Sequence, residues 1–213
     1  MIPDRSQFTR GEWRIIQAHH TPARVQRFLS GLTYNLEESG GTCRSFRGVV
    51  QQARAHCLEG ALAAAVILEQ HGHPPLVVSI ESQDKLDHVL FLFEDRGRYG
   101  AVARSRDFGL HGRKPVFRRV RDLVMSYFDP YCDKTGRITG YAVADLRDLG
   151  GYDWRLSHCN VWKVERYLQE IEHREIRSSD ARYHKWRRRY LEFRDRDPNG
   201  PVDIYPKRGL WMF

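Results

Sequence analysis

The segment ARAHCLEGALAAAVILEQHGHPP, residues 53–75, decides the fold of this 213-residue chain. After Cys57, apolar residues cover most of the circumference of a helix predicted to run to about Gln70, so we expect this helix to be buried. Gly72 and the prolines beyond it are typical of a helix end. A thiol at this position is either a small core residue or a nucleophile, because a helix N-terminus stabilises a thiolate.

Predicted strands follow this helix directly. LVVSIE (76–81) is a continuous apolar run, and HVLFLFED (88–95) is apolar at nearly every position, as in a strand that is covered on both faces. The sequence DRGR forms a tight turn, after which RYGAVARS (98–105) returns as the next strand. The order of helix, strand and hairpin predicts an α+β fold in which an antiparallel sheet packs against the buried helix.

The segments outside this core show weaker patterns. Thr21-Pro22 is typical of a helix start, and the spacing of apolar residues predicts helices at 21–35, 120–128 and 160–176. We expect Asp129-Pro130 to end the second of these helices. RITGYAVADL (137–146) is a candidate strand, and residues 1–20 are expected to wrap around the surface.

Composition restricts the class of protein. Hydrophobic residues make up 41% of the chain and charged residues 29%, which is typical of a globular protein. No apolar run approaches the roughly 20 residues that span a bilayer, and the first residues lack the apolar core of a signal peptide. The four cysteines lack CxxC spacing, which argues against a zinc site or a disulfide framework. We therefore expect a cytoplasmic protein with free thiols, no metal and no membrane partner.

The C-terminal third is basic, and the whole chain has a formal net charge of +8. WRRRYLEFRDR (186–196) combines arginines with aromatic residues, a composition that can bind phosphates and stack on bases. The same pattern fits an amphipathic helix whose aromatic residues dock on the protein while its arginines pair with neighbouring acids. We favour the second interpretation over nucleic-acid binding.

A histidine and an aspartate accompany the cysteine. His88 begins the first strand of the hairpin, and Asp107 lies just past the end of the second, so the hairpin can bring both to the same end. His88 can then take the proton of the Cys57 thiol while Asp107 orients the imidazole; Asp95 is a competing orienting acid. Neighbouring side chains at a helix start point apart, so we expect His56 to lie on the surface.

Over residues 21–110, the order and spacing of these residues resemble those of the transglutaminase-like superfamily of papain-type Cys-His-Asp folds. The resemblance rests on PARVQRFLSGLTYN as the preceding helix, the helix and strand that follow Cys57, His88 in DHVLFLF, and Asp107 after one hairpin. It implies a nucleophile, a base and an orienting acid in that order. Many members carry an aromatic residue, typically tryptophan, where this chain has Leu90, which argues against protein crosslinking.

The resemblance implies a thiol-dependent acyl-transfer enzyme without a cofactor, acting on a protein, peptide or small amide through an acyl-enzyme. We expect a cysteine protease or amidase rather than a transferase. The backbone N–H of Cys57 is one candidate oxyanion donor, and Gln51, Gln52 or Tyr34 is the other.

Two further expectations concern the domains of the chain and an alternative function. Residues 1–110 form the transglutaminase-like catalytic core with its N-terminal helix, and residues 111–213 continue the core and end in a helical basic extension. The alternative function is a non-catalytic peptide- or nucleic-acid-binding module of the same fold that uses the basic C-terminal third.

Overall fold

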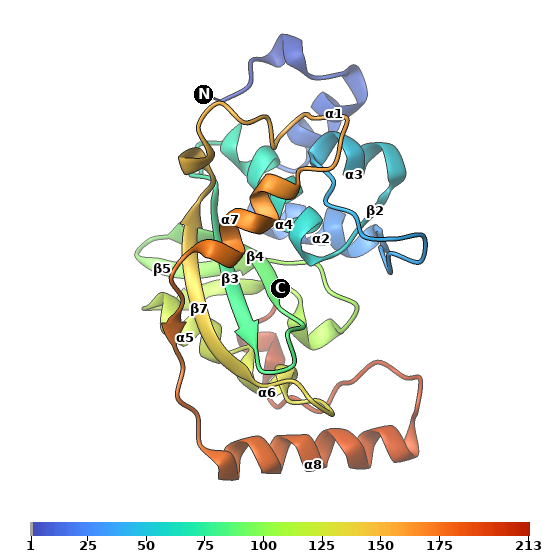
Figure 1. Ribbon diagram of the computed structural model, residues 1–213, viewed down its shortest axis with the longest axis vertical. Helices are drawn as coiled ribbons and strands as arrows, with labels where there is room; N and C mark the ends of the chain where they lie inside the picture. The colour runs from blue at the N-terminus through green and yellow to red at the C-terminus, as the bar shows by residue number, and fades with distance from the viewer. Residues whose placement is uncertain (1) are drawn as a thin grey trace.

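A six-stranded sheet with the order β6-β5-β4-β3-β7-β8 organises the computed structural model, which describes residues 2–213 (Figure 1). All neighbouring strands in this sheet are antiparallel. The strands are β3 (Leu76–Ser82), β4 (His88–Asp95), β5 (Arg98–Val102), β6 (Arg113–Phe117), β7 (Ile138–Asp145) and β8 (Arg174–Glu175). The predicted α+β class and the predicted central hairpin are confirmed.

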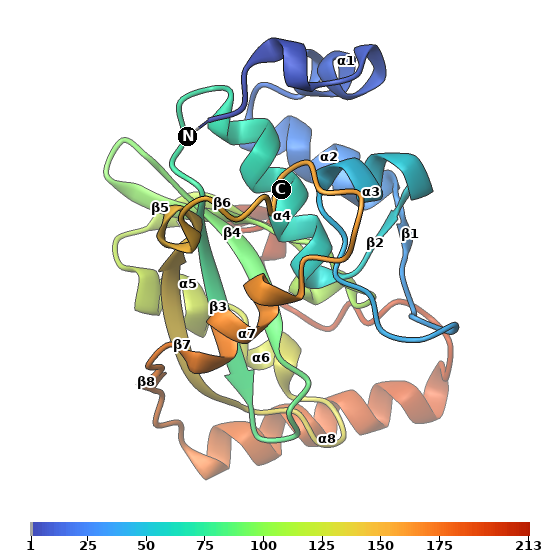
Figure 2. The same cartoon turned by 45° about the horizontal axis from the view of Figure 1, so that its top comes forward.

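Helices cover both faces of the sheet. One apolar core joins the sheet to α1 (Arg10–Ala18), α2 (Pro22–Gly31), α3 (Phe46–Gln52), α4 (Cys57–Glu69) and α7 (Trp162–Glu170). The other core joins it to α5 (Val120–Met125), α6 (Phe128–Tyr131) and α8 (Asp180–Arg196). Figure 2 shows α2 and α3 grouped beside α4, with α8 at the far end of the molecule.

The strand β4 contributes to both cores. Val89, Phe91 and Phe93 pack with the cluster that contains α4, whereas Leu90 and Leu92 pack with the cluster that contains α5 and α6. Successive side chains of a strand point to opposite faces, so a strand in the middle layer must be apolar at consecutive positions. The predicted burial of β4 on both faces is confirmed.

The central helix α4 begins at Cys57, as predicted, and every residue from Leu58 to Glu69 is buried. Gly60 allows a close approach to the segment after β5, because a Cβ added at this position would lie 2.7 Å from the Cβ of Arg104. After the helix, Gly72 adopts a φ of 86°, a conformation that favours glycine. The close approach at Gly60 fixes the end of α4 that carries the cysteine against the segment after β5.

Three predicted boundaries in the flanking segments are wrong. Residues 1–20 do not only wrap the surface, since α1 forms there and buries Ile16. Pro130 does not end the helix of 120–128; it lies in the first turn of α6, where its missing N–H removes no helical hydrogen bond. The helix predicted to reach residue 176 ends at Glu170, because the chain becomes extended and β8 pairs with the sheet edge.

The second hairpin strand is also shorter than predicted, and a side chain explains the difference. The amide of Gln26 on α2 accepts a hydrogen bond from the Ala103 N–H and donates one to the Ala103 carbonyl, each at 2.9 Å. These bonds take the place of a strand partner, so β5 ends at Val102 and the chain leaves the sheet toward residue 107.

The remaining short elements connect these layers. They are β1 (Thr33–Tyr34), which pairs in parallel with β2 (Arg54–Ala55), and the 3₁₀ helices η1 (Arg5–Gln7), η2 (Phe108–Leu110), η3 (Leu146–Leu149) and η4 (Arg208–Leu210). The strands β6, β7 and β8, which follow residue 110, complete the sheet that the hairpin begins. No helix within residues 2–213 is long and apolar enough to cross a bilayer.

Candidate active site

A cavity of about 720 Å³ opens beside the N-terminus of α4. Its lining includes Cys57 from α4, His88 from β4, Tyr34 from β1 and Asp107 from the loop after β5. The structure thus brings four of the six sequence-predicted site residues to one cavity. The Cys57 side chain is partly exposed, so a reagent or substrate in the cavity can reach its sulfur.

Cys57 occupies the position at which a helix favours an anion. It is the first residue of α4, so its N–H has no acceptor within the helix. Its Sγ lies 4.0 Å from the carbonyl oxygen of Asp87, next to the start of β4. Burial raises the pKa of the Cys57 thiol, but hydrogen bonds and charge from His56 and His88 outweigh burial and lower it to about 5.

His88 is buried, and a main-chain carbonyl orients its ring. Its Nε2 lies 3.0 Å from the oxygen of Leu110 in η2, and its ring packs edge-on against Tyr127. A carbonyl oxygen only accepts hydrogen bonds, so Nε2 carries the proton and Nδ1 is the acceptor of the neutral ring. In this tautomer His88 can take the proton of a thiol.

Asp107 lines the cavity but does not orient His88, contrary to the predicted triad. Its carboxylate lies 3.7 Å from the guanidinium of Arg106, and it occupies the N-cap position of η2. Because the chain turns there, the carbonyl of Leu110 reaches the ring instead of the carboxylate. Asp95, the competing orienting acid, is the backbone register partner of Arg98 at the turn end of the hairpin, whereas His88 begins β4 at the other end.

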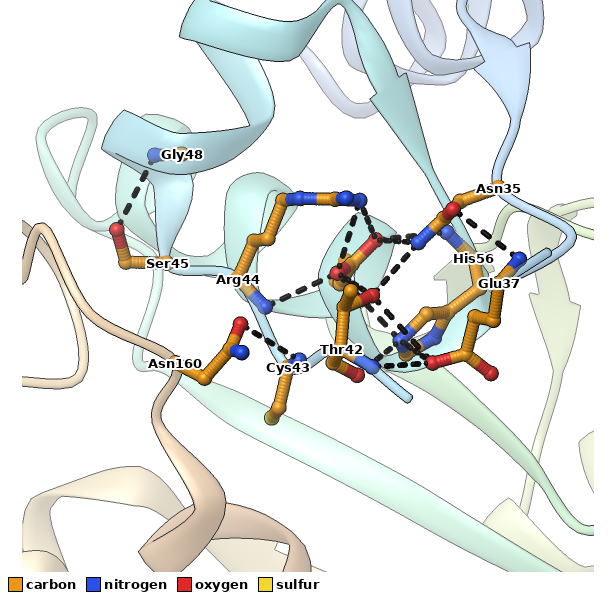
Figure 3. A network of polar contacts seen from close by, with 10 residues as sticks. Asn35, Glu37, Thr42, Cys43, Arg44, Ser45, Gly48, His56 and Asn160 are labelled. Carbon is orange, nitrogen blue, oxygen red and sulfur yellow. Dashed lines mark hydrogen bonds and ion pairs between the residues drawn. The ribbon is translucent and has the colours of Figure 1, made fainter. Parts of the chain in front are cut away.

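His56 is not a surface residue, and this expectation was wrong. Its side chain is 13% exposed, and its Nε2 lies 2.9 Å from the carbonyl oxygen of Thr42 (Figure 3). The physical reason is the neighbouring carboxylate of Glu59, which accepts a hydrogen bond from the His56 N–H and lies 3.6 Å from the ring. The sequence held a signal for this arrangement, because Glu59 stands at the third helical position after His56, as in a capping box.

The structure separates the candidate oxyanion donors. Gln51 and Gln52 are exposed at the end of α3 and do not line the cavity. Tyr34 does, because β1 pairs with β2 immediately before Cys57. Burial, and then the charge of Cys57, raise the pKa of Tyr34, so its hydroxyl keeps its proton and can donate a hydrogen bond.

The cavity differs in charge from the rest of the chain. Its lining includes seven Asp and Glu residues but only Lys85 and Arg106 among the Lys and Arg residues, a formal charge of −5 with histidines neutral. The whole chain carries +8. Several of the carboxylates form loop hydrogen bonds, as Asp133 does with the N–H groups of Thr135 and Gly136.

The other thiols lie in different environments. Cys43 and Cys132 are buried, and burial raises the pKa of each to about 12, whereas Cys159 is exposed. Within residues 2–213, no group of three or more histidine, cysteine or acidic residues is arranged to hold a metal ion.

The basic helix α8 packs partly against the protein. Tyr183 and Trp186 are buried in the core on its side of the sheet. The guanidinium of Arg189 lies 4.6 Å from the ring centre of Trp186, and Arg187 donates a hydrogen bond to the carbonyl of Lys134. These contacts fit the docked amphipathic helix that the sequence favoured.

No protein-family model and no curated protein sequence matches this chain.

Proposed function

We propose that this protein is a thiol-dependent acyl-transfer enzyme, and that it hydrolyses amide or peptide bonds in the cytoplasm. The observation that carries the proposal is the accessible thiol of Cys57, placed at a helix N-terminus with two imidazoles beside it in a cavity. The order of cysteine-bearing helix and histidine-bearing strand supports a transglutaminase-like core. Four unpaired cysteines fit a reducing compartment.

The chemistry follows from the arrangement of these groups. The Sγ of Cys57 attacks the carbonyl carbon of the amide, and the tetrahedral oxyanion accepts hydrogen bonds from the Cys57 N–H and the Tyr34 hydroxyl. His88 takes up a proton from the solvent of the cavity and gives it to the leaving amine as the C–N bond breaks, and an Sγ–C thioester remains. His88 then removes a proton from water, whose oxygen attacks the thioester and releases the acid and the Cys57 thiolate.

The charge of the cavity indicates the kind of amide that it accepts. A lining of formal charge −5 attracts cations and repels anions, an effect strengthened when the surrounding walls have a low dielectric constant. We propose that the substrate carries a basic side chain or amine near the scissile amide.

Trapping of the acyl-enzyme tests the proposal. The protein is mixed with a set of peptide amides and thioester-forming acyl donors, quenched in acid, and the mass of each cysteine-bearing fragment is measured. We expect a thioester on Cys57 that is absent in Cys57→Ser. In His88→Gln the thioester should form only from the activated acyl donors, and it should then resist hydrolysis. Release of ammonia or amine should be lost in both variants.

The same experiment distinguishes the alternative function. A protein that forms no thioester, yet binds a polyanion with a salt-sensitive affinity that Cys57→Ser leaves unchanged, would be a binding module instead. The exposed Cys159 serves as the reference for non-specific acylation.

A further inference from the structure

We propose that His56, held by the buried carboxylate of Glu59, is the resting counter-ion of the Cys57 thiolate, which leaves His88 free for proton transfer. This inference rests on the proposed function, because it divides the work of that site between two imidazoles. His56 is then a positioning residue, which holds a positive charge beside the thiolate. Glu59 acts through His56 by holding its ring in place.

Glu59 is the centre of a buried polar network, whose members Asn35, Thr42, Arg44 and His56 are labelled in Figure 3. Its side chain is fully buried in the first turn of α4. It accepts hydrogen bonds from the Asn35 amide at 3.1 Å, the Thr42 hydroxyl at 2.8 Å, and the N–H groups of Arg44 and His56 at 3.0 and 3.1 Å. A buried carboxylate with this many donors has one fixed position.

The ring of His56 lies against two carboxylates and a carbonyl. Its Nε2 is 2.9 Å from the Thr42 oxygen, 3.6 Å from Glu59 Oε1 and 3.8 Å from Glu37 Oε1. The carbonyl requires a proton on Nε2, so Nδ1 is the nitrogen that remains for the sulfur. Burial lowers the pKa of His56, but Cys57 and Glu59 outweigh burial and raise it to about 9.

The other groups around the sulfur do not take this role. Tyr34 from β1 and Tyr131 from α6 line the same cavity, and burial, followed by the charge of Cys57, raises the pKa of both, so they are neutral donors at most. The Tyr131 hydroxyl already donates a hydrogen bond to the carbonyl of Leu86. His88 from β4 contacts only the neutral carbonyl of Leu110 through its Nε2. Positive charge therefore resides preferentially on His56, beside the carboxylates, and the Nδ1 of His88 is left for the proton transfers of the reaction.

Alkylation of Cys57 by iodoacetamide, resolved by site and measured from pH 4 to 10, tests this division. In His56→Gln we expect the alkylation rate at pH 6 to fall about twofold or more, as the rise of the rate moves at least about one pH unit upward. Glu59→Gln should move it in the same direction by less. Because Glu59 is buried, Glu59→Gln is used only if it shows a native thermal transition. If it does not, His56→Gln alone decides the test.

A control variant and an activity assay distinguish a failure of this inference from a failure of the proposed function. His158→Gln, which removes an exposed imidazole, should leave the profile unchanged. His56→Gln should recover amide hydrolysis at pH 9, where the thiolate forms unaided, whereas His88→Gln should not. An unchanged alkylation profile in His56→Gln overturns the inference even if the enzyme is active. A shifted profile in a protein that never forms an acyl-enzyme overturns the proposed function and leaves the counter-ion role intact.

Discussion

At the scale of single residues, the reactivity of Cys57 follows from its thiolate. The thiolate fraction falls as the pH falls through the pKa, and for Cys57 that value is about 5, against roughly 8.5 for a free cysteine. We predict that iodoacetamide alkylates Cys57 at a nearly constant rate from pH 6 to 8, and that the rate declines below pH 5. The buried Cys43 and Cys132 should stay unmodified under the same conditions. A Cys57 rate that begins to rise only above pH 8 would contradict this account.

The position of Asp107 gives a second prediction at this scale. Because the Leu110 carbonyl, and not this carboxylate, contacts His88, Asp107→Asn should leave the pH profile of Cys57 alkylation unchanged and change kcat by less than about threefold. The matched substitution His88→Gln should abolish turnover. Steady-state kinetics of the two variants distinguish an orienting carbonyl from a Cys-His-Asp triad, since loss of an orienting carboxylate typically costs orders of magnitude in kcat.

These residues also show what the sequence could predict of the site. Cys57 and His88 were placed correctly because each begins an element whose start is set by a strong apolar pattern. The contact between Leu110 and His88 uses a main-chain carbonyl, which any residue type supplies, so no pattern of side chains indicates it. The inward position of His56 depends on Glu59, and the buried network around that carboxylate joins segments that are separate in sequence.

At the scale of elements, the close approach of α4 to the segment after β5 predicts the effect of one methyl group. Gly60→Ala would place a Cβ 2.7 Å from the Cβ of Arg104, an overlap that neither side chain can relieve by rotation. We expect a loss of about 1–3 kcal/mol in the free energy of unfolding, measured by urea denaturation. Gly31→Ala is the control, because nothing lies within 4 Å of its added Cβ, and it should be neutral or slightly stabilising.

The other end of α4 is held by a buried ion pair. Glu69 accepts two hydrogen bonds from the guanidinium of Arg155, both at 2.7 Å, and both side chains are buried. Glu69→Ala leaves the arginine charge buried without a partner, so we expect a loss of about 3–5 kcal/mol in stability. Arg177→Ala, which breaks an exposed pair with Glu175, should cost less than about 1 kcal/mol. An equal fall of the melting temperature in the two variants would contradict the difference in burial between the two ion pairs.

Elements were predictable where the period of apolar residues was uninterrupted. The pattern identified α4, β3, β4 and β7 because each is long and buried. It did not identify β8, whose two residues are exposed and whose formation depends on pairing with β7. It also overextended the strand β5, whose end is set by the amide of Gln26 on α2 and not by its own residues.

At the scale of the whole molecule, charge is separated between the cavity and the remaining surface. The basic surface attracts polyanions in general, whereas the cavity beside Cys57 has a formal charge of −5 and favours a cation. Salt screens both fields, with a Debye length of about 8 Å at physiological ionic strength, and it screens interactions inside a partly enclosed cavity less than those on the exposed surface.

This separation predicts a preference between matched substrates. For two peptide amides that differ only in a Lys or a Glu next to the scissile bond, we expect kcat/KM to favour the Lys peptide by about tenfold or more at low salt. Glu165→Gln removes one negative charge from the α7 side of the cavity, away from the thiol, and should reduce the ratio without altering the alkylation of Cys57. Lys185→Gln, on α8 and outside the cavity lining, is the matched control and should leave the ratio unchanged. Equal rates for both peptides at low salt would mean that the carboxylates of the cavity only form hydrogen bonds within its loops and do not select the substrate.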